Sequence, residues 1–235
     1  MIPKVIHYCW FGRNPLPASA QKCIASWRKF LPDYEIKEWN EDNFDVNIIP
    51  YTQQAYEAKK YAFVSDYARF WILHREGGLY FDTDVEVITP FNDIVNKGAF
   101  MGLEIDGTIE GLKIAINPGL GLGAEVGIPI YLDILDGFSK LDFYDANGKR
   151  NNYSMIPMVT EMFLQRGLIA NGQIQQLCGI TIYPQCYFNP YNSLNDRLQL
   201  SPETHSIHWY SATWMEPKRL WLAKLKRMIR KLLNV

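Results

Sequence analysis

Cysteine is scarce in this 235-residue sequence, and none of its cysteines forms a C-x-x-C pair. Cys9, Cys23, Cys178 and Cys186 therefore lack the spacing of a zinc finger or a dithiol redox motif, and we expect them to be reduced and mostly buried. No run of about 18 apolar residues occurs, so we expect no membrane-spanning helix. No signal-peptide pattern opens the chain, which favours a cytoplasmic location.

An excess of charge of one sign is also lacking. The chain has 24 Lys and Arg against 25 Asp and Glu, which argues against a basic nucleic-acid binder, so we expect no nucleic-acid partner. Residues 218–235 hold seven of the basic residues and no acidic residue, which leaves 17 basic against 25 acidic residues in 1–217. The length favours one globular domain over 1–217, followed by a basic segment over 218–235.

Apolar and turn patterns alternate along this domain. Residues 5–10, 34–39, 79–88 and 180–183 have strand patterns, and 100–104 and 206–210 have weaker ones. Helical patterns cover about 18–30, 52–76, 128–138 and 155–166, and Gly77-Gly78 has the position of a helix C-cap. Residues 117–127, with four glycines, resemble a loop. The order predicts one α/β domain with a mostly parallel central sheet.

Two carboxylates, Asp82 and Asp84, stand at the end of an apolar strand pattern. Side chains two apart in a strand point the same way, and open α/β sheets bind ligands at this edge. Like charges so close need a cation, and Mg²⁺ or Mn²⁺ prefers carboxylates together with phosphate oxygens. These residues therefore indicate a metal–diphosphate site, although a solvated strand end would look the same.

The preceding helical pattern adds a second charged pair. Asp66 and Arg69 share one helix face, three positions apart, and their neighbours are apolar on nearly all sides. A surface ion pair is the simpler interpretation, but a helix with these neighbours is buried, and buried charges need a reason.

The run Ser65-Asp66-x-x-Arg69, followed by Gly77-Gly78-x-Tyr80-x-Asp82-x-Asp84, resembles the signature of sugar-nucleotide glycosyltransferases with a D-x-D motif. It is similar to glycosyltransferase family 32, to the capsular polysaccharide transferases and yeast-type mannosyltransferases grouped with it, and to the glucosylating domains of large clostridial toxins. The opening Ile2-Pro3-Lys4-x-Ile6-His7-x-x-Trp10 and the ending His208-x-x-Ser211-x-x-Trp214 resemble the same family, so the resemblance extends over residues 2–214.

The resemblance implies a GT-A fold, which is one Rossmann-like α/β domain, together with a UDP-sugar donor and Mn²⁺ or Mg²⁺. It implies that Asp84 binds the metal and that Asp82 contacts the ribose and the metal's water shell. Asp66 and Arg69 would hold the donor, Trp10 would stack on the base, and Asn117 would lie near the donor sugar. His208 would complete the metal shell or touch the diphosphate, with Ser211 and Trp214 closing over the phosphates. From the residues alone, Trp10 could equally be a core residue, Asn117 a turn residue and His208 a structural one, and His7 is interpreted as structural.

The resemblance also implies a retaining reaction. No double-displacement nucleophile is evident, which favours a front-face route in which the leaving phosphate helps to deprotonate the acceptor hydroxyl. Glu104, Asp106 and Glu125 stay open as assisting carboxylates. Galactose, glucose or their N-acetyl forms from UDP are the favoured donors, and GDP-mannose is the alternative.

The basic segment has a helical periodicity. Trp221 and the Leu, Ile and Met residues after it fall on one face, with five Lys and Arg on the other. This pattern favours a helix on an anionic membrane surface, which suits a lipid-linked glycan acceptor of capsule or O-antigen synthesis on the inner face of the plasma membrane. Packing on the acidic domain, or on a partner protein, is the alternative.

Two other function classes stay open from the residues alone. A nucleotidyltransferase also uses paired carboxylates and a metal, but it needs a longer glycine-rich phosphate loop than Phe11-Gly12-Arg13-Asn14. A non-catalytic carbohydrate-binding protein would suit the aromatic content of 14%, but it would leave the paired carboxylates without a purpose.

Overall fold

The fold is given by a computed structural model, which describes residues 1–108, 111, 113–151, 155–192 and 196–211. The strands are β1 (Val5–Cys9), β2 (Glu35–Trp39), β3 (Gly78–Tyr80), β4 (Val85–Val87), β5 (Phe100–Ile105), β6 (Ala115–Ile116), β7 (Leu122–Ala124), β8 (Gln175–Leu177), β9 (Ile180–Tyr183), β10 (Tyr191–Asn192), β11 (Arg197–Leu198) and β12 (Ser206–His208). The helices are α1 (Ala18–Phe30), α2 (Pro50–Glu57), α3 (Tyr61–Glu76), α4 (Asn92–Val95), α5 (Pro129–Ser139), α6 (Met155–Leu164) and α7 (Gln185–Phe188), with a 3₁₀ turn η1 (Pro118–Leu120).

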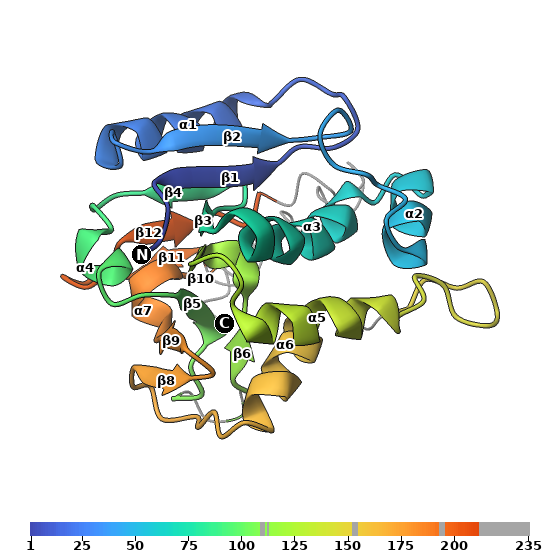
Figure 1. The fold of residues 1–235 in the computed structure, drawn as a ribbon. Helices are drawn as coiled ribbons and strands as arrows, with labels where there is room; N and C mark the ends of the chain where they lie inside the picture. The colour runs from blue at the N-terminus through green and yellow to red at the C-terminus, as the bar shows by residue number, and fades with distance from the viewer. Residues whose placement is uncertain (109–110, 112, 152–154, 193–195, 212–235) are drawn as a thin grey trace.

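The central sheet is mixed (Figure 1). Its strand order is β2-β1-β3-β7-β5-β9-β8, with β6 on β5. Three of its pairings are parallel and four are antiparallel. The prediction of a mostly parallel sheet was therefore wrong, although the α/β class is correct.

The reason lies in the glycine-rich segment that was expected to be a loop. Part of it forms β7, which runs antiparallel between β3 and β5 in the middle of the sheet. At Gly123 a Cβ would lie 2.2 Å from the Phe100 ring, so only glycine allows this close approach. A strand of small residues carries no alternating apolar pattern, and the sequence could not reveal it.

Two hydrophobic cores lie on the two faces of the sheet. Along β1, Ile6 and Tyr8 pack into the core that also contains Trp27 of α1, whereas Cys9 packs into the core formed with α2, α3, α5 and α6. Figure 1 shows α1 beside β2, and it shows α3 and α5 beyond β1, on the side away from α1. Successive side chains of a strand point to opposite faces of the sheet, so a strand that is buried on both faces supplies side chains to both cores in turn.

Two expected elements are each divided in two. The helix expected over 52–76 is broken between α2 and α3, where Lys59 has a left-handed φ of 57°. No glycine or proline marks this break, so the sequence does not indicate it. The strand expected over 79–88 is divided into β3 in the central sheet and β4, which pairs with β12 in a separate two-stranded sheet.

The turn at Gly77-Gly78 connects α3 to β3 as expected. Gly77 has a φ of 65° and its N–H donates to the Leu73 carbonyl at 2.9 Å, which is the C-cap arrangement. At Gly78, φ is 98° and a Cβ would lie 2.7 Å from the Val5 carbonyl oxygen. The two glycines thus let the chain reverse tightly and place β3 against β1.

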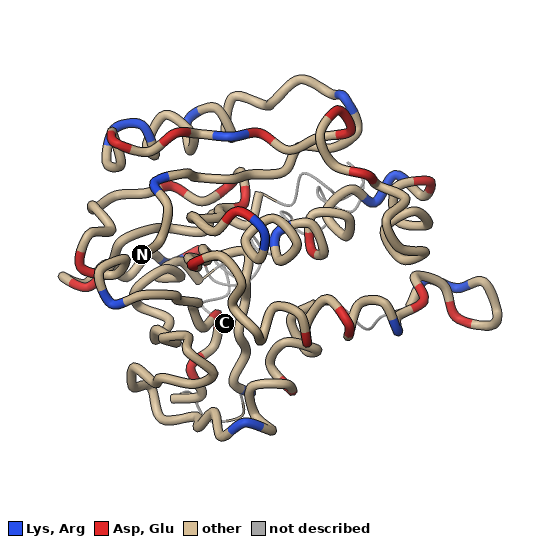
Figure 2. The backbone as a smooth tube through the Cα atoms, in the orientation of Figure 1, with Lys and Arg blue, Asp and Glu red and all other residues tan. Residues whose placement is uncertain are grey.

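Charges of both signs are interspersed over the described chain, for example along α1 and β2 (Figure 2). No helix in the described ranges is long and apolar enough to cross a membrane.

The four cysteines are all free, as expected; Cys9 and Cys23 are buried, whereas Cys178 is exposed. The expected boundary at 217/218 and the basic helix over 218–235 lie outside the described residues.

His7 is a buried structural residue, as the sequence indicated. Its Nδ1 accepts a hydrogen bond from Trp39 Nε1 at 3.0 Å, and its Nε2 lies 3.0 Å from the Gly77 carbonyl. This pattern requires the neutral ring with a proton on Nε2. Burial lowers the pKa of His7 from 6.5 to about 4.

This buried imidazole predicts acid sensitivity of the fold. Because the unfolded chain binds a proton at His7 between pH 6.5 and 4 and the folded chain does not, the free energy of unfolding falls as the pH decreases through this window, by about 3 kcal/mol for this group. Denaturant unfolding at pH 7.5 and pH 4 measures the loss. His7→Gln can keep both hydrogen bonds without titrating, so its loss should be smaller by about that amount, whereas His74→Gln should behave as the wild type. Equal losses of unfolding free energy in the wild type, His7→Gln and His74→Gln would contradict the assignment of this acid sensitivity to His7.

Candidate active site

A cavity of about 880 Å³ opens at the carboxyl ends of the first strands. Its walls come from the end of β1, one face of α3, the 82–84 connection, Glu104 of β5, and the end of β12. The structure brings together in it seven of the nine residues that the sequence analysis selected: Trp10, Asp66, Arg69, Asp82, Asp84, Asn117 and His208. Ser211 contacts Asp84 from outside this lining, and Trp214 lies outside the described residues.

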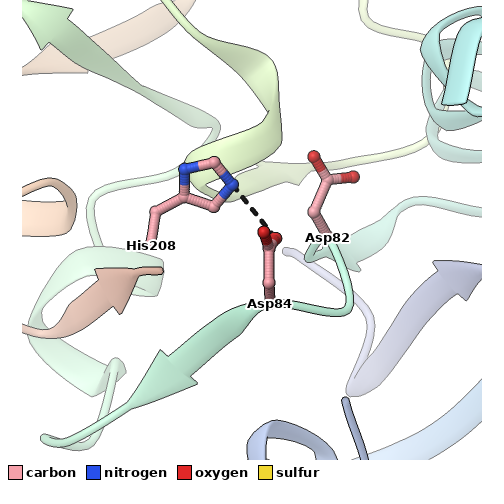
Figure 3. Close-up of side chains that lie close together, drawn as sticks. All are labelled: Asp82, Asp84 and His208. Atoms are coloured by element: carbon pink, nitrogen blue, oxygen red, sulfur yellow. Dashed lines mark ion pairs between the residues drawn. The ribbon is translucent and has the colours of Figure 1, made fainter. Parts of the chain in front are cut away.

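The D-x-D carboxylates do not lie on a strand, contrary to expectation. The chain leaves the central sheet after Tyr80 and enters β4 only at Val85, so Asp82 and Asp84 belong to the connection between two sheets. Phe81, fully buried, anchors this connection. The two carboxylates still lie close together and face the same space as His208 (Figure 3).

Asp84 is fixed from two sides by the C-terminal segment. Its Oδ1 lies 3.0 Å from Nε2 of His208, and its Oδ2 accepts a hydrogen bond from the Ser211 N–H at 2.8 Å. The antiparallel pairing of β12 with β4 places His208 opposite Val85, next to Asp84. Burial would raise the pKa of Asp84, but His208 and the Ser211 N–H hold it below its usual value, and the pKa of His208 is raised in turn by Asp84. Without a bound cation the two side chains form a buried ion pair.

Asp82 belongs to a second network, centred on Arg69. Nη2 of Arg69 lies 2.9 Å from Asp66 Oδ1 and 3.2 Å from Asp82 Oδ1, and Nε donates to the Ser65 carbonyl at 3.1 Å. Its guanidinium lies over the Tyr80 ring, 4.9 Å from the centroid, and the Tyr80 hydroxyl donates to Asp82. Burial raises the pKa values of Asp66 and Asp82, and Arg69 opposes both shifts. The i, i+3 pair predicted on α3 is thus confirmed as a buried contact that aligns Asp82.

Asn117 orients two neighbours at the opposite wall. Its Nδ2 donates to Glu104 Oε2 at 3.0 Å, and its Oδ1 accepts from the Gly119 N–H at 2.8 Å. A Cβ at Gly119 would lie 2.3 Å from Asp82 Oδ2, so glycine is needed here to leave the carboxylate in place. Asn117 therefore caps a turn and also lines the cavity, and its place near a donor sugar stays a prediction.

Trp10 lines the cavity at the end of β1, half-buried, with Nε1 donating to the Asn14 carbonyl at 2.6 Å. Its side chain also packs against the hydrophobic core that contains Trp27, and its stacking on a base stays a prediction.

Of the three carboxylates left open as assisting groups, only Glu104 lines the cavity. Asp106 accepts hydrogen bonds from Thr108 on the surface, and Glu125 lies 3.5 Å from the N-terminal amine. Sequence reasoning quoted Tyr80 within the motif but gave it no role; in the structure its hydroxyl donates to Asp82. Sequence reasoning also missed two cavity-lining cations, Lys59 and Arg150, which follow helices in otherwise ordinary surface sequence.

Asp82, Asp84 and His208 together form a candidate metal site, since one ligand atom from each lies within 4.8 Å of the others. Two carboxylates and an imidazole form a suitable donor set for Mn²⁺ or Mg²⁺. The site therefore fits the divalent cation expected from the sequence.

The mixed α/β sheet, with paired carboxylates and a histidine at one end of the cavity, has a GT-A-like arrangement. The fold itself is similar to a solved glycosyltransferase involved in glycosylation of the major capsid of PBCV-1, with a TM-score of 0.50 and 11% identity over 94% of this chain and 100% of that one.

Residues 17–101 match the family described as glycosyltransferase sugar-binding region containing DXD motif, a segment that includes Asp66, Arg69, Asp82 and Asp84. The resemblance to the D-x-D glycosyltransferases is thereby confirmed over this segment.

Curated relatives match part of the chain. An uncharacterized glycosyltransferase of Acanthamoeba polyphaga mimivirus is 31% identical over 43% of this chain and 42% of its own length. Inositol phosphoceramide mannosyltransferase 3 of Schizosaccharomyces pombe is 32% identical over 36% of this chain and 24% of its own length. The chain thus spans less than half the length of these curated relatives.

Proposed function

We propose that this protein is a metal-dependent retaining glycosyltransferase that moves a hexose from a nucleoside-diphosphate sugar to a glycan acceptor. The convergence of Asp82, Asp84 and His208 in one cavity with the Arg69–Asp66 pair carries the proposal. The cavity volume of about 880 Å³ lies within the range of small-molecule sites and is sufficient for a nucleotide sugar.

Each residue has a distinct task in the donor complex. Asp84, Asp82 and His208 would hold Mn²⁺ or Mg²⁺, which when bound neutralises charge on the leaving diphosphate. Arg69 positions Asp82 and adds a fixed positive charge near the site. Trp10 offers a ring at the cavity wall for the base, and Asp66 and Asn117 offer polar atoms to the ribose or the donor sugar.

The reaction follows a front-face route. The bond between the anomeric carbon and the β-phosphate oxygen breaks, the acceptor oxygen bonds to the same face of that carbon, and its proton passes to the leaving phosphate. Glu104, held by Asn117 at 3.0 Å, is the remaining carboxylate in the cavity that can orient a hydroxyl.

UDP-linked galactose, glucose or an N-acetyl form is the favoured donor. GDP-mannose is the second candidate, because two of the relatives from Schizosaccharomyces pombe are named as mannosyltransferases. For the acceptor we propose a lipid-linked glycan of capsule or O-antigen type at the inner face of the plasma membrane, with residues 218–235 binding anionic lipid.

The first test is nucleotide release from a panel of UDP- and GDP-sugars. We expect one donor to release its nucleotide in the presence of Mn²⁺, and EDTA to lower the rate by at least about a hundredfold, because the charge on the leaving diphosphate is then no longer neutralised. Nucleotide binding by calorimetry serves as the second readout. If the wild type neither releases nor binds any nucleotide with Mn²⁺, and binds free sugars equally well with EDTA, a carbohydrate-binding protein replaces the transferase.

A further inference from the structure

Three cations line the active-site cavity, and they differ in how they are paired. Arg69 is paired with Asp66 and Asp82 through its Nη2. Lys59 and Arg150 line the same cavity, yet neither forms an ion pair with any carboxylate of the described ranges. The other ionisable groups of the wall, apart from His208, are all acidic: Asp66, Asp82, Asp84 and Glu104.

Arg150 is held in place by the loop that precedes it. This loop returns from α5 through Phe143, a buried residue whose ring packs on Tyr51 and Phe63 at 5.8 and 5.5 Å. The backbone of Arg150 forms an isolated antiparallel β-bridge with that of Tyr144. The Arg150 guanidinium lies over the Phe63 ring, 5.2 Å from its centroid. Stacking fixes the plane of the guanidinium while leaving its N–H groups available for hydrogen bonds.

The position along α3 separates Arg150 from the carboxylate cluster. Phe63, under Arg150, lies six residues before Arg69, which is about 9 Å along a helix axis. Lys59 lies further in the same direction, in the connection that precedes α3. The two cations therefore lie away from the carboxylate cluster, so that they can bind an anionic group of an acceptor while that cluster holds the leaving diphosphate.

We propose that Arg150, assisted by Lys59, forms an anion subsite for the acceptor, so that the acceptor glycan carries a phosphate or a carboxylate near the hydroxyl that is glycosylated. This inference rests on the proposed transferase function and specifies its acceptor class. An arginine fork binds either group through two parallel N–H···O bonds. A cation at this position also offsets the repulsion between an anionic acceptor and the four carboxylates of the wall.

The test uses glucose 6-phosphate, glucuronic acid and glucose as probes. Calorimetry measures their binding to the full chain saturated with UDP and Mn²⁺, so that the phosphate cannot occupy the donor site. We expect at least one anionic sugar to bind about fivefold to tenfold more tightly than glucose, and Arg150→Gln to remove this preference. Arg166→Gln, which alters an exposed arginine paired with Asp133, should keep the preference.

Several results would overturn the subsite. The first is equal or undetectable binding of all three sugars by the wild type. The second is an unchanged preference for the anionic sugar in Arg150→Gln. The third is a loss of UDP affinity alone in that variant, which would assign the guanidinium to the donor. The relative affinities of the phosphate and the carboxylate identify the group. Failure of the transferase function is seen separately, as the absence of nucleotide release and binding in the wild type.

Discussion

Replacing Asp84 with asparagine is expected to lower the turnover of the donor sugar by at least about a thousandfold while leaving the fold intact. The substitution removes the charge of the residue that best fits a direct metal ligand, which is several kcal/mol of stabilisation of the leaving diphosphate. Asparagine keeps an oxygen that can accept the Ser211 N–H, so the C-terminal segment stays attached. Initial rates of nucleotide release, measured at saturating Mn²⁺ together with the thermal unfolding temperature, separate the two effects.

Glu86→Gln is the matched control for this variant. Glu86 is a carboxylate on β4, two residues away, and it accepts a hydrogen bond from Trp209 Nε1 at 2.8 Å without lining the cavity. The Glu86→Gln variant should retain a turnover of the donor sugar within a few-fold of the wild type. Turnover of Asp84→Asn close to that of Glu86→Gln would show that the charge at position 84 is not used in the reaction.

The second large effect is expected at Arg69, and it concerns stability as well as turnover. Arg69 has a side chain only 3% exposed, and it neutralises Asp66 and Asp82 together. Arg69→Met keeps the volume but leaves two partly buried carboxylates, 16% and 28% exposed, uncompensated, which costs up to about 3 to 5 kcal/mol. For a chain of this length we expect the melting temperature to fall by roughly 6 to 20 °C, and nucleotide release to be lost with it.

A second substitution distinguishes buried charge from lost packing. Asp66→Asn, combined with Arg69→Met, removes one of the uncompensated charges, so the double variant should recover part of the melting temperature. It should not recover turnover, because Asp82 still lacks the partner that positions it. A double variant that is less stable than Arg69→Met would show that the loss comes from packing around Tyr80 rather than from charge.

The site was easier to predict than the sheet. Asp66 and Arg69 were recognisable because charges on a helix that is otherwise apolar have few structural explanations. The motif Asp82-x-Asp84 was recognisable from its residue types, but the reason given for its geometry was wrong: the carboxylates converge through partners from α3 and β12 rather than through the alternation of a strand.

What the sequence could not reveal depends on contacts distant along the chain. The place of β7 in the centre of the sheet follows from a close approach at Gly123 that no local pattern encodes. The break at Lys59 has no glycine or proline to mark it. Arg150 enters the cavity through packing of Phe143, a long-range contact, so its sequence neighbourhood resembles any exposed loop. The prediction of a membrane-binding helix over 218–235 stays a prediction.

The pairing of β4 with β12 also joins parts of the site that the ribosome synthesises at different times. Asp84 receives its hydrogen bond from a residue that follows it by 127 positions. On a ribosome that adds about 5 to 20 residues per second, the carboxylate emerges on the order of 6 to 25 s before the segment that aligns it. The nascent chain can therefore fold around the β1–β3 pairing while Asp84 still lacks His208 and Ser211, and the candidate metal site is assembled only after residue 211 has been added.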